Sequence, residues 1–151
     1  MINHSITLHS PSNFESMKKA GQLASDVLDY LTPFVEPKVT TGFLNDLAHE
    51  YIVSKGAIPA PLNYKGFPKS TCISVNHVVC HGIPGDKKLN SGDILNIDVT
   101  VILDGWYGDT SRMFFAGKPS VKAKRLCDIT YQCLMVGIEA SKPGATLGDV
   151  G

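Results

Sequence analysis

Apolar residues recur at helical spacing in the first third of the chain, which predicts two helices packed on a common core. The pattern Ser12-Asn13-Phe14-Glu15 reads as a capping box at the start of the first helix, which should end just before Pro33. Its apolar stripe consists of Phe14, Met17, Leu23, Val27, Leu28 and Leu31, with the small residues Ala20 and Ala24. We expect this stripe to face the core.

The second helix is expected to begin after Thr40-Thr41 and to stop near Gly56. Its apolar stripe, also expected to face the core, consists of Phe43, Leu44, Leu47, Ala48, Tyr51 and Ile52. The segment 58–70 is rich in proline, glycine and aromatic residues, which is typical of a loop.

The middle of the chain has the alternating pattern of strands. Residues 71–75 and 78–81 are predicted as two short strands joined by a turn at Asn76-His77, which would place Cys72 opposite His81. Residues 93–103 and 106–115 flank Asp104-Gly105, a strong signal for a two-residue hairpin turn.

A third helix follows this hairpin. Ser120 is its expected N-cap and Pro143-Gly144 should close it. One face of it carries Leu126, Ile129, Cys133, Leu134 and Ile138. The element order predicts an α+β domain with its helices on one face of a sheet.

The predicted hairpin brings two carboxylates together. If Asp104-Gly105 is the whole loop, Thr100 pairs with Asp109, and Asp98 becomes a diagonal neighbour with its Cα about 7 Å from that of Asp109. All three side chains then share one face of the strands. Ile97, Val99 and Val101 occupy the opposite face, which has the character of a core.

Three interpretations of this pair remain open at this point. The two carboxylates are solvated on an exposed sheet face, they share a proton as an acid dyad, or they hold a divalent metal ion. Their neighbours favour the metal. Gly108 is expected to leave backbone room beside Asp109, and Thr110 and Ser111 offer hydroxyls that could orient the carboxylates.

His81 is the second candidate for chemistry, because it lies at a predicted strand end before a glycine turn. A histidine there can exchange a proton near neutral pH, or it can simply satisfy a backbone carbonyl. The other histidines are expected on the surface; they are His4, His9, His49 and His77.

Composition removes several classes of function. The chain has 151 residues, and its 14 basic residues balance its 14 acidic ones, so phosphate attraction is not a main source of affinity and no direct binding of nucleic acid is expected. It lacks both a run of about 18 apolar residues and the apolar segment of a signal peptide. None of its four cysteines forms a C-x-x-C pair. We therefore expect a cytoplasmic protein without a membrane role, whose cysteines are buried and reduced.

Three segments together resemble type I methionine aminopeptidase over nearly the whole chain from about Ser12. They are VCHGIP at 79–84, NIDVT at 96–100 and DGWYGDTS at 104–111, and YKGFPKS at 64–70 adds to them. The resemblance implies the pita-bread fold and removal of the initiator methionine from new proteins. It also implies that Asp98 and Asp109 are ligands of a dinuclear metal site, with Asp109 bridging both ions.

The resemblance assigns further residues. His81 matches the position that contacts the substrate near the scissile bond, and Tyr64, Phe67 and Cys72 match positions that line a methionine pocket. Pro61 stands where bacterial relatives often have cysteine, so that wall is expected to differ in shape. Asn76 and Val78 match a site where backbone carbonyls hold a monovalent cation, Na⁺ or K⁺.

The implied cofactors are two divalent ions, and carboxylate ligation suits Mn, Fe(II), Co or Zn alike. The implied partners are nascent polypeptide N-termini near the ribosome, and the full-length form is expected to be a monomer. The family's other three ligands, one histidine and two glutamates, lie downstream of Asp109 and have no counterpart here, since Glu139 is the only glutamate that follows.

We therefore expect residues 1–151 to be a single domain, the N-terminal half of a pita-bread catalytic domain, truncated at Gly151. The alternatives are a non-catalytic pita-bread module that binds a partner, and an inactive fragment.

Overall fold

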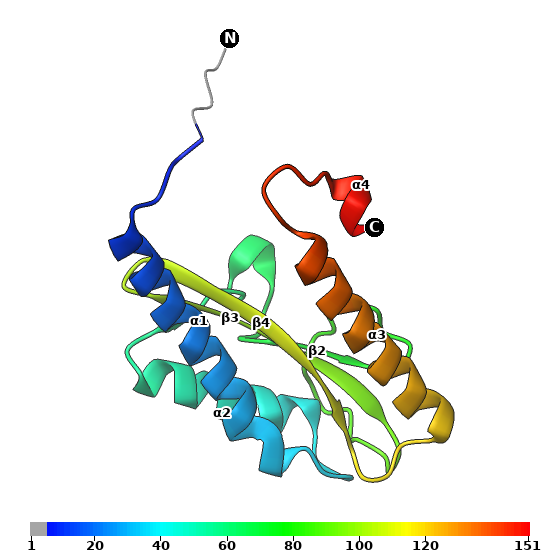
Figure 1. The fold of residues 1–151 in the computed structure, drawn as a ribbon. Coiled ribbons are helices and arrows are strands. Elements are labelled where there is room, and N and C mark those ends of the chain that lie inside the picture. The colour runs from blue at the N-terminus through cyan, green and yellow to red at the C-terminus, as the bar shows by residue number, and fades with distance from the viewer. Residues whose placement is uncertain (1–5) are drawn as a thin grey trace.

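The molecule is organised around β3 (Ile94–Leu103), with which every other strand pairs in antiparallel fashion. The structure is a computed structural model and describes residues 6–151. β4 (Trp106–Phe115) pairs along one edge of β3. β1 (Ile58–Pro59) and β2 (Cys72–Val75) pair with successive parts of the other edge (Figure 1). The α+β class predicted from the sequence is confirmed.

The β3–β4 hairpin has the predicted register. Leu103 pairs with Trp106, and the pairing continues residue by residue through Thr100 and Asp109. The turn residues Asp104 and Gly105 have φ angles of 51° and 81°, which are the two positive values that a type I′ turn needs. Aspartate and glycine tolerate this conformation, so the turn fixes which residues face each other.

The other predicted hairpin, between residues 71–75 and 78–81, does not form. Residues 78–81 form no strand, and Cys72 pairs with Asp98 on β3 instead of with His81. The chain leaves β2 through Asn76, whose φ is 55°, and the Val78 N–H donates to the Val75 carbonyl. This tight turn leads residues 78–82 past β2 without forming a ladder.

Two helices, α1 (Pro11–Leu31) and α2 (Thr41–Ser54), provide the helical side of the core (Figure 1). α2 begins one residue earlier than predicted, at Thr41, because Thr40 is its N-cap and the Thr40 Oγ1 accepts the Phe43 N–H at 3.1 Å. The predicted cap of α1 is displaced by two residues: Ser10 is the N-cap, and its N–H donates to Asn13 Oδ1 at 2.9 Å. Pro11 favours this earlier start because proline suits the first helical position.

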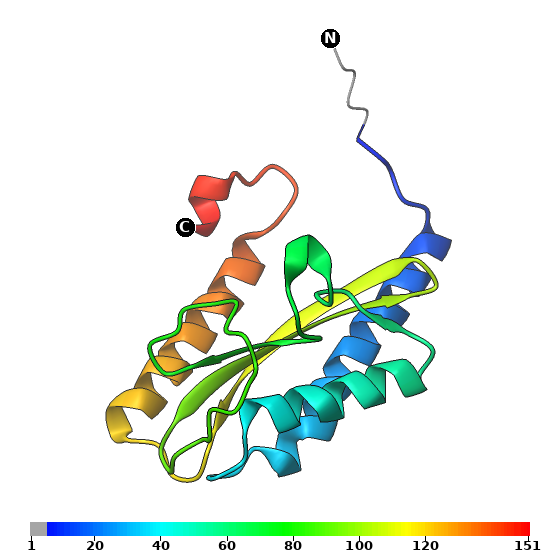
Figure 2. The same cartoon turned by 180° about the vertical axis from the view of Figure 1, so that it is seen from behind.

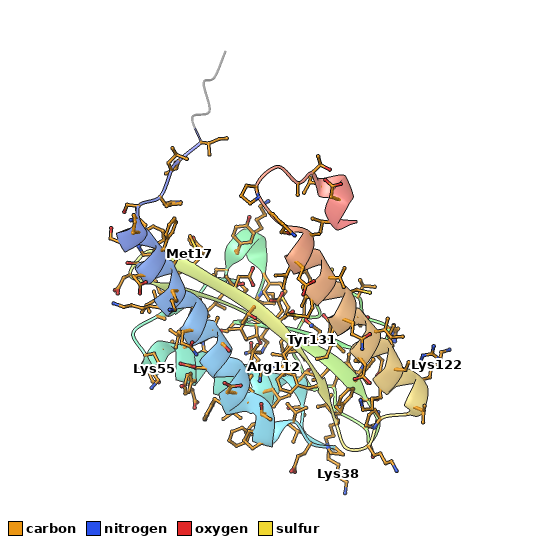
Figure 3. The ribbon with its side chains drawn as sticks, viewed as in Figure 1. Met17, Lys38, Lys55, Arg112, Lys122 and Tyr131 are labelled. Atoms are coloured by element: carbon orange, nitrogen blue, oxygen red, sulfur yellow. The ribbon has the colours of Figure 1, made fainter. Side chains whose placement is uncertain are left out.

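The core forms between these helices and one face of the sheet. Its main members are Leu23, Val27, Leu28 and Leu31 of α1, Leu44, Ala48 and Ile52 of α2, Ile73 and Val75 of β2, and Leu95, Ile97, Val99 and Val101 of β3. Phe14, Met17 and Phe43 were predicted to face the core but are exposed. Phe14 and Met17 lie in the first two turns of α1, before the helix crosses β4 at Ala20 (Figure 3).

The crossing of α1 over β4 depends on Gly108. A Cβ at this residue would lie 2.0 Å from the Ala20 carbonyl oxygen, so the two backbones are in direct contact. Gly108 pairs with the buried Val101 and therefore faces α1. The expectation that Gly108 leaves room beside Asp109 is wrong, because neighbouring residues of a strand point to opposite faces. An ion pair of 2.7 Å between Arg112 and Asp29 also joins β4 to α1 (Figure 3).

The remaining helices, α3 (Val121–Ala140) and α4 (Leu147–Val150), lie outside this core. Ser120 caps α3 as predicted, but none of the α3 residues is buried. Figures 1 and 2 show α3 beside the sheet, apart from α1 and α2, so it adds nothing to the core that those two helices form. Its side chains line grooves with Asn96, Ser111 and Met113, which α1 and α2 do not cover. Within residues 6–151, none of the helices has the length and apolarity needed to cross a membrane.

We predict that Gly108→Ala destabilises the protein by about 2–4 kcal/mol, because the added methyl group collides with the α1 backbone and one of the two elements must move. The matched control is Gly21→Ala, one residue beyond Ala20, where an added Cβ meets nothing within 4 Å. It should stabilise the protein by about 0.5–1 kcal/mol, since alanine favours helix more than glycine does. Urea unfolding measures both, and a loss of similar size in the two variants would contradict this account.

Candidate metal centre

The sheet face turned away from α1 and α2 carries a row of polar side chains, here called the site face. Asp98 pairs with Cys72 on one side and with Ser111 on the other, and Thr100 pairs with Asp109. Residues directly opposite each other share a face, as do residues two apart on one strand. The site face consists of Cys72, Ser74, Asn96, Asp98, Thr100, Asp109 and Ser111.

Asp98 and Asp109 interact on this face as the register predicted. Burial of the Asp98 carboxyl raises its pKa, and the nearby charge of Asp109 raises it further, while His81 acts in the opposite sense. Asp109 is exposed, and its Oδ1 accepts a hydrogen bond of 3.1 Å from Thr100 Oγ1. The sequence predicted the face of the sheet on which the Thr100 side chain lies, but not this hydrogen bond. The bond holds one oxygen of the Asp109 carboxylate in place.

This pair fits a divalent cation, because two close carboxylates of which one is partly desolvated are stabilised by a positive charge between them. The ligand set is partial, however. Within residues 6–151 there is no group of three or more histidine, cysteine, aspartate or glutamate side chains arranged to hold an ion. The carboxylates therefore offer hard oxygen ligands to a cation but do not enclose it.

The two hydroxyls expected to orient the carboxylates lie on different faces. Ser111, opposite Asp98, lies on the site face, and its Oγ accepts a hydrogen bond from Asn96 Nδ2 at 3.3 Å. Thr110 pairs with the buried Val99 and therefore points to the α1 side. The expectation for Thr110 is wrong, because adjacent positions of a strand alternate.

His81 lies in the segment that passes over β2, within electrostatic range of Asp98. Its side chain is exposed and its φ is 52°, a left-handed conformation that is uncommon outside glycine, although asparagine, aspartate and histidine adopt it more often than other residues. Gly82 follows, and its backbone contacts β2 directly. The structure thus brings His81 toward the carboxylates through a strained loop instead of a strand end.

Of the residues expected in a substrate pocket, Cys72 lies beside the carboxylates. Burial, followed by the charges of Asp98, Cys80 and Asp109, raises the pKa of its thiol to about 11, so it remains a neutral apolar group. Tyr64 and Phe67 belong to a separate 3-10 turn (Tyr64–Gly66) and its end. Figure 2, which views the sheet from the side away from α1, shows this turn in front of the strands.

The expectation of four buried cysteines holds only for Cys72. Cys80 and Cys133 are exposed and Cys127 is half-buried, and all four thiols are free.

Asn76 and Val78 lie in the turn after β2. The Asn76 side chain donates to Asp93 Oδ1 at 2.9 Å and accepts the Ile94 N–H at 3.1 Å. Burial alone would raise the pKa of Asp93, but hydrogen bonds from Asn76 and Asn90 outweigh it and lower that pKa. These bonds join the turn to the start of β3 and fix the backbone that carries the Asn76 and Val78 carbonyls.

A buried polar cluster that the sequence did not reveal anchors the approach to β2. Asn45 Oδ1 accepts from the Ser70 and Thr71 N–H groups and from Thr71 Oγ1, at 2.9 to 3.2 Å. His49, which was expected on the surface, is half-buried, and its Nδ1 lies 2.8 Å from Ser70 Oγ. The signal for this cluster in the sequence is one asparagine, Asn45, within the apolar stripe of α2. His4 lies outside the described residues.

Known proteins resemble the chain closely in sequence. It is 62% identical to "Methionine aminopeptidase" of Rickettsia prowazekii over 146 residues, covering 97% of this chain and 56% of that protein. It is 50% identical to "Methionine aminopeptidase" of Escherichia coli K12 over 148 residues, again 97% of this chain and 56% of that protein. The chain thus spans about half the length of these relatives.

Solved structures show the same likeness. A crystal structure of methionine aminopeptidase from Rickettsia prowazekii superposes with a TM-score of 0.95 at 61% identity, over 97% of this chain and 59% of that one. Prolidase from Pyrococcus furiosus, at 20% identity, has a TM-score of 0.79 over 95% of this chain and 41% of that one, which shows the fold alone. The predicted pita-bread fold is confirmed, as a partial one.

The model of metallopeptidase family M24 matches residues 15–151, a span that contains both carboxylates and His81. With the paired aspartates on the site face and the close likeness to solved structures, this match places the chain in metallopeptidase family M24.

Proposed function

We propose that the protein removes the initiator methionine from newly made proteins, by metal-dependent hydrolysis of the first peptide bond. The observation that carries this proposal is the placement of Asp98 and Asp109 on the sheet face turned away from α1 and α2, with His81 nearby. Identities of 50% and 62% to proteins named methionine aminopeptidase support it. Those relatives are longer than this chain, so activity is proposed for the protein as its host cell produces it.

In this proposal Asp98 would hold one of two divalent ions, and Asp109 would be a ligand of both. When bound, such ions supply a water of lowered pKa and polarise the peptide carbonyl. Thr100 keeps Asp109 oriented through its hydrogen bond. Among the described residues no group of three or more metal-ligating side chains forms, so the proposal requires ligands in addition to these two carboxylates. Mn, Fe(II), Co and Zn all suit carboxylate ligands.

His81 is proposed to contact the substrate beside the scissile bond, where an imidazole N–H stabilises developing charge. Cys72, Tyr64 and Phe67 are proposed to receive the methionine side chain. A neutral thiol and aromatic rings suit a thioether, which binds through apolar contact. The backbone carbonyls of Asn76 and Val78 are proposed to hold Na⁺ or K⁺. The proposed partners are nascent N-termini near the ribosome, in the cytoplasm, and the protein is proposed to act as a monomer without binding nucleic acid.

We expect Asp98→Asn and Asp109→Asn each to lower kcat/KM for the peptide Met-Ala-Ser by at least about 100-fold, because an amide binds divalent ions poorly. The assay uses saturating Mn²⁺ or Co²⁺, and calorimetry on the same samples measures metal affinity. The matched control is Asp104→Asn, since Asp104 is exposed at the hairpin tip with φ 51°, which asparagine also tolerates. Normal turnover in either site variant would show that the assigned roles are wrong.

The carboxylate pair should also affect stability in the absence of metal. The raised pKa of Asp98 means that its ionised form is less favourable in the folded protein than in the unfolded chain. Asp98→Asn should therefore raise the urea midpoint in EDTA at pH 7. The gain should shrink as the pH falls toward the usual aspartate pKa of about 4, where the wild-type carboxyl is protonated as well.

The same control separates this effect from a general change of charge. Asp104→Asn should leave the metal-free urea midpoint nearly unchanged, because Asp104 is exposed at the hairpin tip. A lower midpoint for Asp98→Asn, or an equal gain in both variants, would contradict repulsion at the site.

A further inference from the structure

We propose that Ser74 is a positioning residue that holds His81 over the carboxylate pair by binding the backbone of Gly82. This inference rests on the proposed function, because it assigns Ser74 a role through His81. Ser74 lies on the site face of β2, two residues after Cys72, and is buried with only 5% of its surface exposed. Its hydroxyl has no part in the roles assigned above.

The link between Ser74 and His81 is a pair of hydrogen bonds to one residue. The Gly82 N–H donates to Ser74 Oγ at 3.1 Å, and the Gly82 carbonyl accepts the Ile73 N–H at 2.9 Å. Gly82 is thus bound at both its donor and its acceptor by consecutive residues of β2. Since His81 immediately precedes Gly82, the position of its Cα follows from this double attachment.

The fit between Gly82 and β2 is close. A Cβ on Gly82 would lie 2.2 Å from the Ile73 carbonyl oxygen and 2.9 Å from the Ser74 Cα, so no side chain is tolerated there. His81 has its φ of 52° at the same point. A residue keeps such a conformation only when its surroundings hold it there, and the two bonds of Gly82 are the nearest such restraint.

β2 also sets the distance from His81 to the carboxylates. Ser74 pairs with Asn96 and Cys72 pairs with Asp98, so the strand that binds Gly82 is in register with the first carboxylate. The charge of His81 opposes the rise in the pKa of Asp98, so the imidazole lies within electrostatic range of that carboxyl group. Gly82, β2 and β3 therefore form one continuous backbone connection between His81 and Asp98.

Loss of the Ser74 hydroxyl should loosen His81 without disturbing the carboxylates. In Ser74→Ala the Gly82 N–H loses its acceptor at a site that the buried strand shields from water. In the protein as its host cell produces it, we expect kcat for Met-Ala-Ser to fall by about 10- to 100-fold. KM and the affinity for Mn²⁺ should stay within about twofold. Ser74→Thr keeps the hydroxyl and suits a strand, so it should retain most of the activity.

A double-mutant cycle with His81→Ala distinguishes positioning from general destabilisation. If Ser74 acts through His81, Ser74→Ala should lower kcat by less than about twofold once the imidazole is gone. An equal loss in both backgrounds would overturn the proposal, and so would unchanged kcat in Ser74→Ala alone. Ser54→Ala serves as the control, since the Ser54 hydroxyl binds the Tyr51 carbonyl on the exposed side of α2.

A readout without catalysis keeps this inference separate from the proposed function. Ser74→Ala should accelerate hydrogen exchange of the Gly82 amide by at least about tenfold and shift the ring resonances of His81. If the wild type does not cleave Met-Ala-Ser, the proposed function fails, and these two signals alone decide the role of Ser74. If Ser74→Ala changes neither the exchange rate of the Gly82 amide nor the ring resonances of His81, the positioning role of Ser74 is overturned.

Discussion

One backbone register, that of β3 against β4, determines both the core and the candidate metal centre. Side chains alternate along a strand with a period of two, so a slip by one residue would turn Asp98 and Thr100 toward α1. It would also bring Ile97 and Val99, both fully buried here, to the uncovered face. The type I′ turn at Asp104-Gly105 prevents this slip, and the apolar face of β3 reinforces the same register.

The two faces of the hairpin have opposite physical requirements. On the α1 side, close contact is possible because Gly108 has no side chain and Ala20 is small. On the other side, two carboxylates lie near each other, and burial and mutual repulsion raise the pKa of Asp98. The packing on the first face keeps the repelling pair together on the second. A binding site of this kind is held by the rest of the fold and stabilised when its cation arrives.

The elements governed by local rules were predictable from the sequence. Asp104-Gly105 predicted the hairpin and its register, and with it the shared face of Asp98, Thr100 and Asp109. The cap Ser120 was predictable because a hydroxyl cap acts within a few residues. The α1 start was displaced since Ser10 and Ser12 both offer such a cap, and Pro11 favours the earlier one.

Features that depend on distant segments were not predictable. Residues 78–81 resemble a strand in sequence, yet the turn at Asn76 leads them away from a ladder with β2, and only Gly82 bonds to that strand. Ser74 and Asn45 gave no signal of their own, because their partners Gly82, Ser70 and Thr71 are defined only by the fold. The separation of Thr110 from Ser111 is set by the register, because adjacent residues of a strand point to opposite faces whatever their chemistry.

The most direct test of the central claim is anomalous diffraction from crystals of the protein as its host cell produces it, grown with Mn²⁺ or Co²⁺. The account predicts anomalous peaks within bonding distance of both the Asp98 and the Asp109 carboxylates, at about 2.0–2.3 Å from their oxygens, with the His81 imidazole close by. Metal bound elsewhere, with these two side chains free of it, would contradict the claim that the β3–β4 register builds a metal centre.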